Sequence, residues 1–408
     1  MKNLKGALVF GQSGGPTSVI NASAYGVFSE ALGQENITKV YGACYGIAGV
    51  LEEKFIDMSL VPEEEMELLK TTPSSALGSI RYKLKSAEDD ETDYLRILEV
   101  FKKYDVRYFF YNGGNDSMDT CNKISKYLQK KGYECNVVGI PKTIDNDLSG
   151  TDHCPGYGSA AKYIATTCME VSLDSRVYKS GQIVVMEIMG RNAGWLTAAS
   201  AVAAHKGMGP DLIYVPERDF DLDDFCRRVE VLWSERHNVF VAVSEGIHDK
   251  EGRHIVELFN SVSRDSFNHV QLGGVGAMLA DEIKLRIPGV KVRAIELSLM
   301  QRCAAHLASG TDIAEAVEAG RQGVIAAVNG ETDVMIVFRR AEGKEYECEY
   351  VRVPLSQAAN TESKLPDKYI TDDGTNIDSS FMDYVMPLIQ GESGVKFEDG
   401  VPRFAKIR

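Results

Sequence analysis

Short apolar runs alternate with segments of helical periodicity along most of this chain. The run GALVFGQ begins at residue 6 and leads into glycines, and after it the apolar residues Ile20, Ala24 and Val27 recur at helical spacing, in a helix expected from about Thr17. Such alternation is typical of parallel sheets with helices on both faces, so the sequence predicts an α/β fold. Further strands are expected in TKVYGACYG, RYFFYNGG, NVVGIPKTIDND, GQIVVMEIMG, DLIYVPE, NVFVAVSEG and KVRAIEL. Further helices are expected in TDYLRILEVFKKY, in a segment from Ser117, in GSAAKYIATTCMEV and in AGWLTAASAVAAH.

The domain organisation follows from the same pattern. The loop-like stretch DLSGTDHCPGYGS indicates a lobe boundary near residue 150. After about Ala341 the alternation stops and charged residues become frequent. We therefore expect lobes at 1–150 and 151–340, followed by a C-terminal extension over 341–408.

Composition and charge narrow the function classes. The chain has 408 residues, of which 44% are hydrophobic and 25% charged, as in ordinary globular proteins. Its net charge of −14 argues against binding to nucleic acid or anionic membranes, although a local basic pocket can still bind a phosphorylated ligand. The 8 cysteines form no CxxC pair, the histidines form no zinc motif, and no apolar stretch could span a bilayer. We expect a cytoplasmic protein with reduced thiols.

Polar loops after the expected strands carry the candidate chemistry, because ligands of open α/β sheets bind at the carboxyl ends of strands. Gly14 and Gly15 precede a helix, and backbone amides at a helix N-terminus favour phosphate. The loop NGGNDS contains Gly114, but it also places the carboxylate of Asp116 where an anion would bind. Neither loop is a Walker A motif or GxGxxG, which counts against a conventional nucleotide site.

The loop PKTIDNDL combines a cation with two carboxylates. On an extended segment Thr143, Asp145 and Asp147 would point to one side, which gives a hydroxyl, a base and a second acid near Lys142. An Asx-rich turn or a metal-binding loop would explain the same residues. At another strand end, Arg191 follows a glycine, and a guanidinium there can bind a phosphate through two hydrogen bonds.

Taken in order, the motifs SGG, GSIR, GGNDS, PKTIDND, MGR, SEG and QR resemble the phosphofructokinase-A family over roughly residues 6–330. The resemblance implies two Rossmann-like lobes with mainly parallel sheets. Lobe 1–150 would bind the phosphoryl donor, and 151–340 mainly the sugar phosphate, with some chain returning to the first lobe. It also implies Mg²⁺-assisted phosphoryl transfer to the 1-hydroxyl of fructose 6-phosphate, with Asp145 as the general base.

The same resemblance distributes the remaining roles. Lys142, Thr143, Arg191 and Asp116 would join Asp145 in the catalytic set. Asn115 stands where the family has an aspartate linked to Mg²⁺. The donor-binding residues that it implies are Gly14, Gly15, Arg81, Gly114, Asp116 and Lys142. The substrate-binding residues that it implies are Thr143, Ile144, Asp145, Asp147, Met189, Gly190, Arg191, Glu245, Arg293 and Arg302.

Two residues indicate the donor. ATP-using relatives have a small residue where Asp116 stands, and a carboxylate there would fill the space for the α-phosphate of ATP. It would also repel that phosphate, by roughly 4 kcal/mol for unit charges about 4 Å apart at an effective dielectric near 20. ATP-using relatives have glycine in place of Lys142, whereas pyrophosphate-dependent members carry lysine. We therefore expect pyrophosphate as the donor, in a reversible reaction that gives fructose 1,6-bisphosphate and phosphate.

Several positions depart from the family pattern. Asn115 offers Mg²⁺ an oxygen without charge. Gln182 replaces an arginine that many relatives donate to the sugar 6-phosphate of a neighbouring subunit, and Leu299 replaces a histidine or tyrosine. These departures leave a second acceptor open, such as sedoheptulose 7-phosphate. Arg293 would be donated across a subunit interface, which implies a homodimer or homotetramer. The alternatives are an ATP-dependent 6-phosphofructokinase and a non-catalytic regulatory subunit that binds sugar phosphates.

Overall fold

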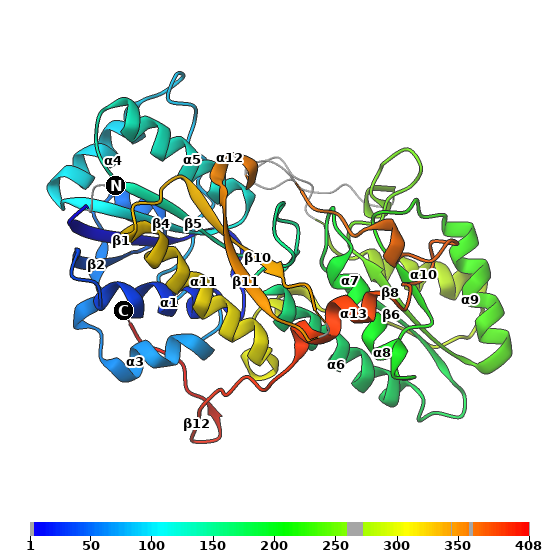
Figure 1. Cartoon of the computed structure of the whole chain (residues 1–408). Coiled ribbons are helices and arrows are strands. Elements are labelled where there is room, and N and C mark those ends of the chain that lie inside the picture. The colour runs from blue at the N-terminus through cyan, green and yellow to red at the C-terminus, as the bar shows by residue number, and fades with distance from the viewer. Residues whose placement is uncertain (1–3, 259–271, 344, 359–361, 408) are drawn as a thin grey trace. The chain divides into compact units, whose positions relative to one another are not determined.

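The structure is a computed structural model that describes residues 4–258, 272–343, 345–358 and 362–407 (Figure 1). Contacts divide the chain into two compact units. Unit 1 comprises Met1–Ser159, Arg302–Glu362 and Gln390–Arg408, and unit 2 comprises Ala160–Gln301 and Ser363–Ile389. The last part of the chain is thus shared between both units, where we expected a separate C-terminal extension over 341–408. None of the helices in the described ranges is long and apolar enough to cross a membrane.

Unit 1 is built on a seven-stranded sheet with the strand order β11-β10-β5-β4-β1-β2-β3. Its central strands are parallel, and only the outermost strands, β3 and β11, run antiparallel to their neighbours. A small antiparallel pair, β12 and β13, lies near the C-terminus. The strands are β1 Gly6–Gln12, β2 Ile37–Ala43, β3 Phe55–Asp57, β4 Val106–Gly113, β5 Asn136–Pro141, β10 Val334–Arg340, β11 Cys348–Pro354, β12 Phe397–Glu398 and β13 Val401–Pro402.

Alternating side chains of the central strands build two hydrophobic cores, one on each face of this sheet. Leu8 and Phe10 of β1 belong to the core under α1 and α11, whereas Val9 belongs to the core under α4 and α5. Figure 1 shows these two helix pairs on opposite sides of the sheet. The helices of unit 1 are α1 Ile20–Leu32, α2 Ile47–Leu51, α3 Glu63–Leu68, α4 Thr92–Lys103, α5 Asn115–Lys130, α11 Gly310–Val328 and α12 Leu355–Ala358.

Unit 2 contains a four-stranded, wholly parallel sheet with the order β7-β8-β6-β9. Ile183 and Val185 of β6 pack into a core with residues of α9 and α10. On the other face of the sheet, the sulfur atoms of Met186 and Cys168 of α6 lie 3.5 Å apart. The elements are β6 Gln182–Ile188, β7 Leu212–Tyr214, β8 Asn238–Ser244, β9 Val292–Glu296, α6 Tyr157–Ser175, α7 Trp195–Ala199, α8 Ala201–His205, α9 Leu222–Arg236, α10 Val275–Arg286 and α13 Phe381–Val385.

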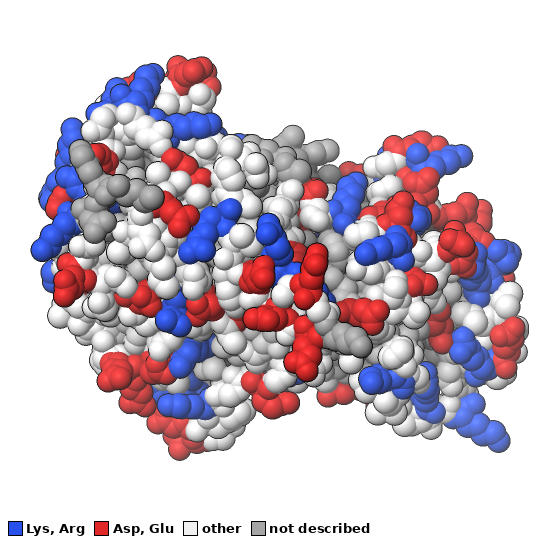
Figure 2. All heavy atoms as spheres, in the orientation of Figure 1, with Lys and Arg blue, Asp and Glu red and all other residues white. Residues whose placement is uncertain are grey.

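The predicted α/β class is confirmed, with mainly parallel sheets covered by helices. Two local predictions were wrong. The expected strand NVVGIPKTIDND ends at Pro141, because proline has no N–H group to donate to a neighbouring strand. The expected helix AGWLTAASAVAAH is divided at Ser200 into α7 and α8. On the face drawn in Figure 2, acidic and basic side chains are intermixed and form no extended basic surface.

Candidate active site

Lys142 lies directly beyond the end of β5 and is almost fully buried, at 4% exposure. Its Nζ donates a hydrogen bond of 2.7 Å to the carbonyl oxygen of Gly15, and its backbone N–H donates to Gly113 at 3.1 Å. Burial lowers the pKa of the ammonium to about 8, although the nearby carboxylates of Asp145 and Asp147 partly oppose this shift. The side chain thus brings a positive charge to the first glycine loop.

A second cation approaches the same loop, and the two glycines leave room for both. A Cβ atom on Gly14, whose φ is +76°, would lie 3.2 Å from Nζ of Lys142. A Cβ atom on Gly15 would lie 3.2 Å from Nη1 of Arg302. Burial lowers the pKa of Arg302, and the charge of Arg81 lowers it further. Unit 1 therefore groups Lys142, Arg302 and Arg81 around the loop predicted to bind phosphate.

Arg81 is placed by hydrogen bonds between its own segment and the glycine loop. The hydroxyl of Ser79 donates to the carbonyl oxygen of Gly14 at 2.6 Å, and the N–H of Gly14 donates to Ile80 at 3.2 Å. The two segments contain the motifs SGG and GSIR of the sequence analysis. The structure joins them directly, which the sequence could not show.

The TIDND loop carries the two predicted carboxylates, but it is not extended. It bends after Thr143, whose hydroxyl oxygen accepts a hydrogen bond of 3.1 Å from the N–H of Asp145, and Asn146 has a φ of +58°. The period-of-two argument for this loop was therefore wrong. Burial raises the pKa of Asp147, and the neighbouring charge of Asp145 raises it further. The two carboxylates thus lie close together, although a turn rather than a strand brings them there.

Two side chains that the sequence did not single out support this loop. The Oδ1 atom of Asn146 accepts a hydrogen bond of 2.9 Å from the N–H of Cys154. Asp312 of α11 is buried, and its carboxylate accepts hydrogen bonds from the N–H of Gly156 at 2.9 Å and of Ser159 at 2.8 Å. The N–H of Thr143 in turn donates to the carbonyl of residue 155 at 3.3 Å. Asp312 therefore holds the segment against which the TIDND loop rests.

The sequence around Asp312 indicates a different role, that of a residue at the start of a helix. Ser309 and Asp312 have the spacing of a capping box at a helix start, and the Ser309 hydroxyl oxygen does accept a hydrogen bond from the N–H of Asp312. The cap uses only the backbone N–H of Asp312. It therefore gives no indication that the carboxylate of the same residue binds a distant segment. Burial raises the pKa of that carboxyl to about 6.

The loop NGGNDS ends β4 and begins α5. Gly114 immediately precedes the helix. Ile144, in the neighbouring TIDND loop, is buried. The Oδ1 atom of Asn115 is buried and has no hydrogen-bond partner among the described residues. Asp116 is exposed in the first helical turn. An unpartnered amide oxygen at this position fits a hard cation such as Mg²⁺, which prefers oxygen ligands.

In unit 2 the MGR and SEG motifs are bound to each other beyond β6 and β8. The N–H of Gly190 donates to a carboxylate oxygen of Glu245 at 3.3 Å, and the hydroxyl of Ser244 donates to the carbonyl of Gly190 at 2.6 Å. The N–H of Met189 donates to Gln301 at 3.3 Å. Arg191 follows directly and is partly buried. Met189, Gly190, Arg191 and Glu245 thus lie at the carboxyl ends of these two strands, and their roles in binding stay predictions.

Arg293 is not brought to this group within its own chain. It lies on β9, where it is exposed and pairs with Val184 of β6. Val184 stands four residues before Ile188, so at about 3.3 Å per residue Arg293 is roughly 13 Å from the strand end. Gln182 is buried at the start of β6, at 2% exposure.

Known proteins share this architecture and much of this sequence. A family model described as phosphofructokinase matches residues 7–326. A pyrophosphate–fructose 6-phosphate 1-phosphotransferase of Halomonas elongata is 42% identical over 402 residues, which cover 98% of this chain and 95% of that protein. A sulfofructose kinase of Alkalicoccus urumqiensis is 33% identical over 368 residues, which cover 89% of this chain and 91% of that protein.

A solved structure gives the same result for the fold. The crystal structure of a pyrophosphate-dependent phosphofructokinase from Marinobacter aquaeolei matches with a TM-score of 0.87 and 39% identity, over 98% of this chain and 96% of that one. The family model alone spans most of the sequence, from within β1 to the last turn of α11. The chain belongs to the phosphofructokinase family.

Proposed function

We propose that the chain transfers a phosphoryl group from pyrophosphate to the 1-hydroxyl of fructose 6-phosphate, reversibly, giving fructose 1,6-bisphosphate and phosphate. The contact of Lys142 Nζ with the glycine loop, 2.7 Å from the carbonyl of Gly15, carries this proposal. A buried ammonium beside Arg302 matches a short, highly charged donor that has no nucleoside. The exposed carboxylate of Asp116 at the start of α5 would repel a longer polyphosphate.

The residues of unit 1 would perform the chemistry. Asp145 accepts the proton of the 1-hydroxyl as the hydroxyl oxygen attacks the nearer phosphorus of pyrophosphate. Lys142, Arg302 and Arg81 neutralise charge on the transferred group and on the leaving phosphate, which departs without needing a proton from solvent. Thr143 keeps Asp145 in place through the hydrogen bond to its backbone.

Mg²⁺ belongs to this proposal as the cofactor. Asn115 would contribute its buried, unpartnered Oδ1 atom to hold the ion. When bound, the ion would draw charge from the phosphoryl oxygens of the donor.

The residues of unit 2 would bind the acceptor. Met189, Gly190, Arg191 and Glu245 follow the ends of β6 and β8, where the N–H of Gly190 donates to Glu245 and that of Met189 to Gln301. Such a group is suited to a sugar phosphate. Leu299 supplies no hydrogen bond to the 6-substituent, and one relative carries the name sulfofructose kinase. We therefore include sedoheptulose 7-phosphate and a 6-sulfonated fructose as test acceptors beside fructose 6-phosphate. Arg293 would come from a second copy of the chain, in a homodimer or homotetramer.

The deciding experiment compares pyrophosphate and ATP as donors at saturating Mg²⁺ for the wild type, Asp116→Gly and Asp116→Asn. We expect the wild type to use pyrophosphate only and the glycine variant to gain ATP use. Asn is almost the size of Asp but uncharged, so its result separates charge repulsion from lack of space. Turnover with ATP by the wild type would refute the donor assignment.

The non-catalytic alternative is tested on the chain purified alone. A regulatory subunit would bind fructose 6-phosphate without turnover, whereas we expect the single polypeptide to be active. Asp145→Ala should abolish turnover while leaving the fold, followed by the circular dichroism spectrum, unchanged. Near-normal activity of that variant would rule out Asp145 as the base.

A further inference from the structure

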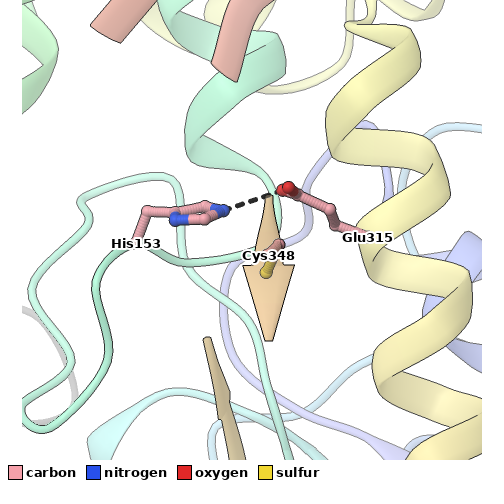
Figure 3. A group of neighbouring side chains, drawn as sticks. All are labelled: His153, Glu315 and Cys348. Atoms are coloured by element: carbon pink, nitrogen blue, oxygen red, sulfur yellow. Dashed lines mark hydrogen bonds and ion pairs between the residues drawn. The ribbon is translucent and has the colours of Figure 1, made fainter. Parts of the chain in front are cut away.

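A second cluster of chemically active side chains lies within unit 1, and none of its members has a role in the proposed phosphoryl transfer. Figure 3 shows the ring of His153 and the carboxylate of Glu315 facing each other, with Cys348 beside them. They come from three places in the fold: the segment after the TIDND loop, helix α11, and the first residue of β11. Their ligand atoms all lie within 4.8 Å of one another.

We propose that His153, Glu315 and Cys348 together bind one transition-metal dication, with Zn²⁺ as the best match. An imidazole nitrogen, a carboxylate oxygen and a sulfur form a donor set that Zn²⁺ accepts in proteins. Mg²⁺ is a hard cation that takes oxygen ligands, so the ion required for phosphoryl transfer would not compete here. The site is thus distinct in chemistry from the oxygen of Asn115, and it does not depend on the proposed reaction.

The hydrogen bonds around His153 orient its ring for such a role. Asp152 Oδ1 lies 2.9 Å from Nδ1, so a proton on Nδ1 leaves the lone pair of Nε2 for the ion. Arg340 holds Asp152 in turn, with Nη2 at 3.2 Å from the same oxygen. Nε2 forms a hydrogen bond of 2.7 Å with Glu315 Oε2, and the hydroxyl of Tyr346 lies 3.4 Å from Nε2, so an incoming ion would displace the proton shared by Nε2 and the carboxylate. Supporting carboxylates of this kind fix the orientation of histidine ligands in metal sites.

Glu315 is likewise oriented so that one of its carboxylate oxygens could bind the ion. The hydroxyl of Tyr346 donates to Oε1 at 2.5 Å, which leaves Oε2 toward His153. Ligand atoms around a tetrahedral Zn²⁺ stand about 3.3–3.6 Å apart, given bond lengths of about 2.0–2.3 Å. The three side chains therefore need shifts of only about 1 Å to close on an ion. His153 and Glu315 are buried, but Cys348 is partly exposed and gives an ion a route from solvent.

A buried ion pair is the competing explanation. A protonated His153 between Asp152 and Glu315 would satisfy both carboxylates with no metal, as the contacts of the structure also permit. In that explanation the thiol of Cys348 stays outside the ion pair, donates weakly to the carbonyl of Glu349 at 3.8 Å and packs against the hydrophobic core. The sulfur therefore provides the signal that separates the two.

The test is a titration of the full-length chain with Co²⁺, in the presence of Mg²⁺ and a reductant without thiols. We expect one Co²⁺ per chain and an intense thiolate-to-cobalt absorption band that Zn²⁺ abolishes by displacement. Cys348→Ser should lose the band and bind at least tenfold more weakly. Cys135→Ser, which changes another partly buried cysteine of unit 1, should behave as the wild type.

A second measurement does not depend on the cysteine variant. Zn²⁺ should raise the melting temperature of the wild type, because an ion that binds only the folded chain stabilises it, and it should not raise that of Glu315→Gln. Absence of Co²⁺ uptake by the wild type, or a band that persists in Cys348→Ser, would overturn the proposal and leave the cluster as an ion pair. Equal Zn²⁺ shifts in the wild type and Glu315→Gln would overturn it as well.

Discussion

At the scale of single residues, Lys142 combines two properties that rarely coexist. Its ammonium is almost fully buried, yet it faces the loop that would receive a strong anion. Burial favours the neutral amine, whereas a bound polyanion favours the charged form. The free protein therefore holds this group near its midpoint at mildly alkaline pH, since its pKa is lowered to about 8.

The pKa of Lys142 predicts how the use of pyrophosphate depends on pH. The charged form binds the anion and is lost as pH rises through the pKa of about 8, so kcat/KM for pyrophosphate should fall by about tenfold from pH 7 to pH 9. Lys142→Arg keeps its charge over this range and should be slower but nearly flat. Both proteins meet the same ionisation of pyrophosphate, so the ratio of their profiles isolates the lysine. Parallel profiles would contradict the assignment.

Single residues also show which members of the candidate site could be named from the sequence and which could not. Gly14, Gly15, Lys142 and Arg302 were all singled out by type and motif, and the structure groups them around one loop. Their roles in binding and catalysis stay predictions. Asp312 was missed, because its partners are backbone N–H groups more than 150 residues away in the chain. One side chain, the hydroxyl of Ser159, also donates to this carboxylate, at 2.5 Å. A distant serine and backbone N–H groups form no charge pair or motif by which the sequence could reveal an aspartate.

At the scale of secondary-structure elements, the strands and helices were more predictable than the loops between them. Periodicity located β4, α4 and α5 closely, since their buried faces repeat over many residues. The TIDND turn could not be located in the same way. Its course depends on the positive φ of Asn146 and on a hydrogen bond to Cys154, and neither leaves a periodic signal.

The connection between α11 and the start of α6 gives a prediction at this scale. Asp312→Asn should lower the free energy of unfolding by about 1–3 kcal/mol, because the amide NH₂ would face the N–H of Ser159 and leave a buried donor unpaired. It should also reduce kcat, since the segment of residues 154–159 supports Thr143. Glu318→Gln on the same helix is the control, and its partly exposed ion pair should contribute less than about 0.5 kcal/mol. Urea unfolding and steady-state kinetics measure both effects; equal results for the two variants would exclude a supporting role for Asp312.

At the scale of the whole molecule, the position of Arg293 predicts a shared site. If Asp145 and Arg293 act together only across a subunit interface, a hybrid of Asp145→Ala and Arg293→Ala chains contains one site with both residues intact. We expect each variant alone to be nearly inactive and the co-expressed, doubly tagged hybrid to recover a substantial part of the wild-type activity. A hybrid as inactive as its parents would place both residues in the same chain's site.

The interrupted course of the chain through unit 1 also has a consequence for its synthesis. Val138 of β5 pairs with Val334 of β10, and all of Ala160–Gln301 lies between them in the sequence. A ribosome that adds about 5–20 residues per second needs roughly 10–40 s to cover the intervening stretch of about 200 residues. Until then the nascent sheet ends at β5, whose unpaired N–H and C=O groups face the surrounding solvent. An open edge of this kind can pair with another growing chain, so the late arrival of β10 sets the period in which this protein is most prone to aggregate.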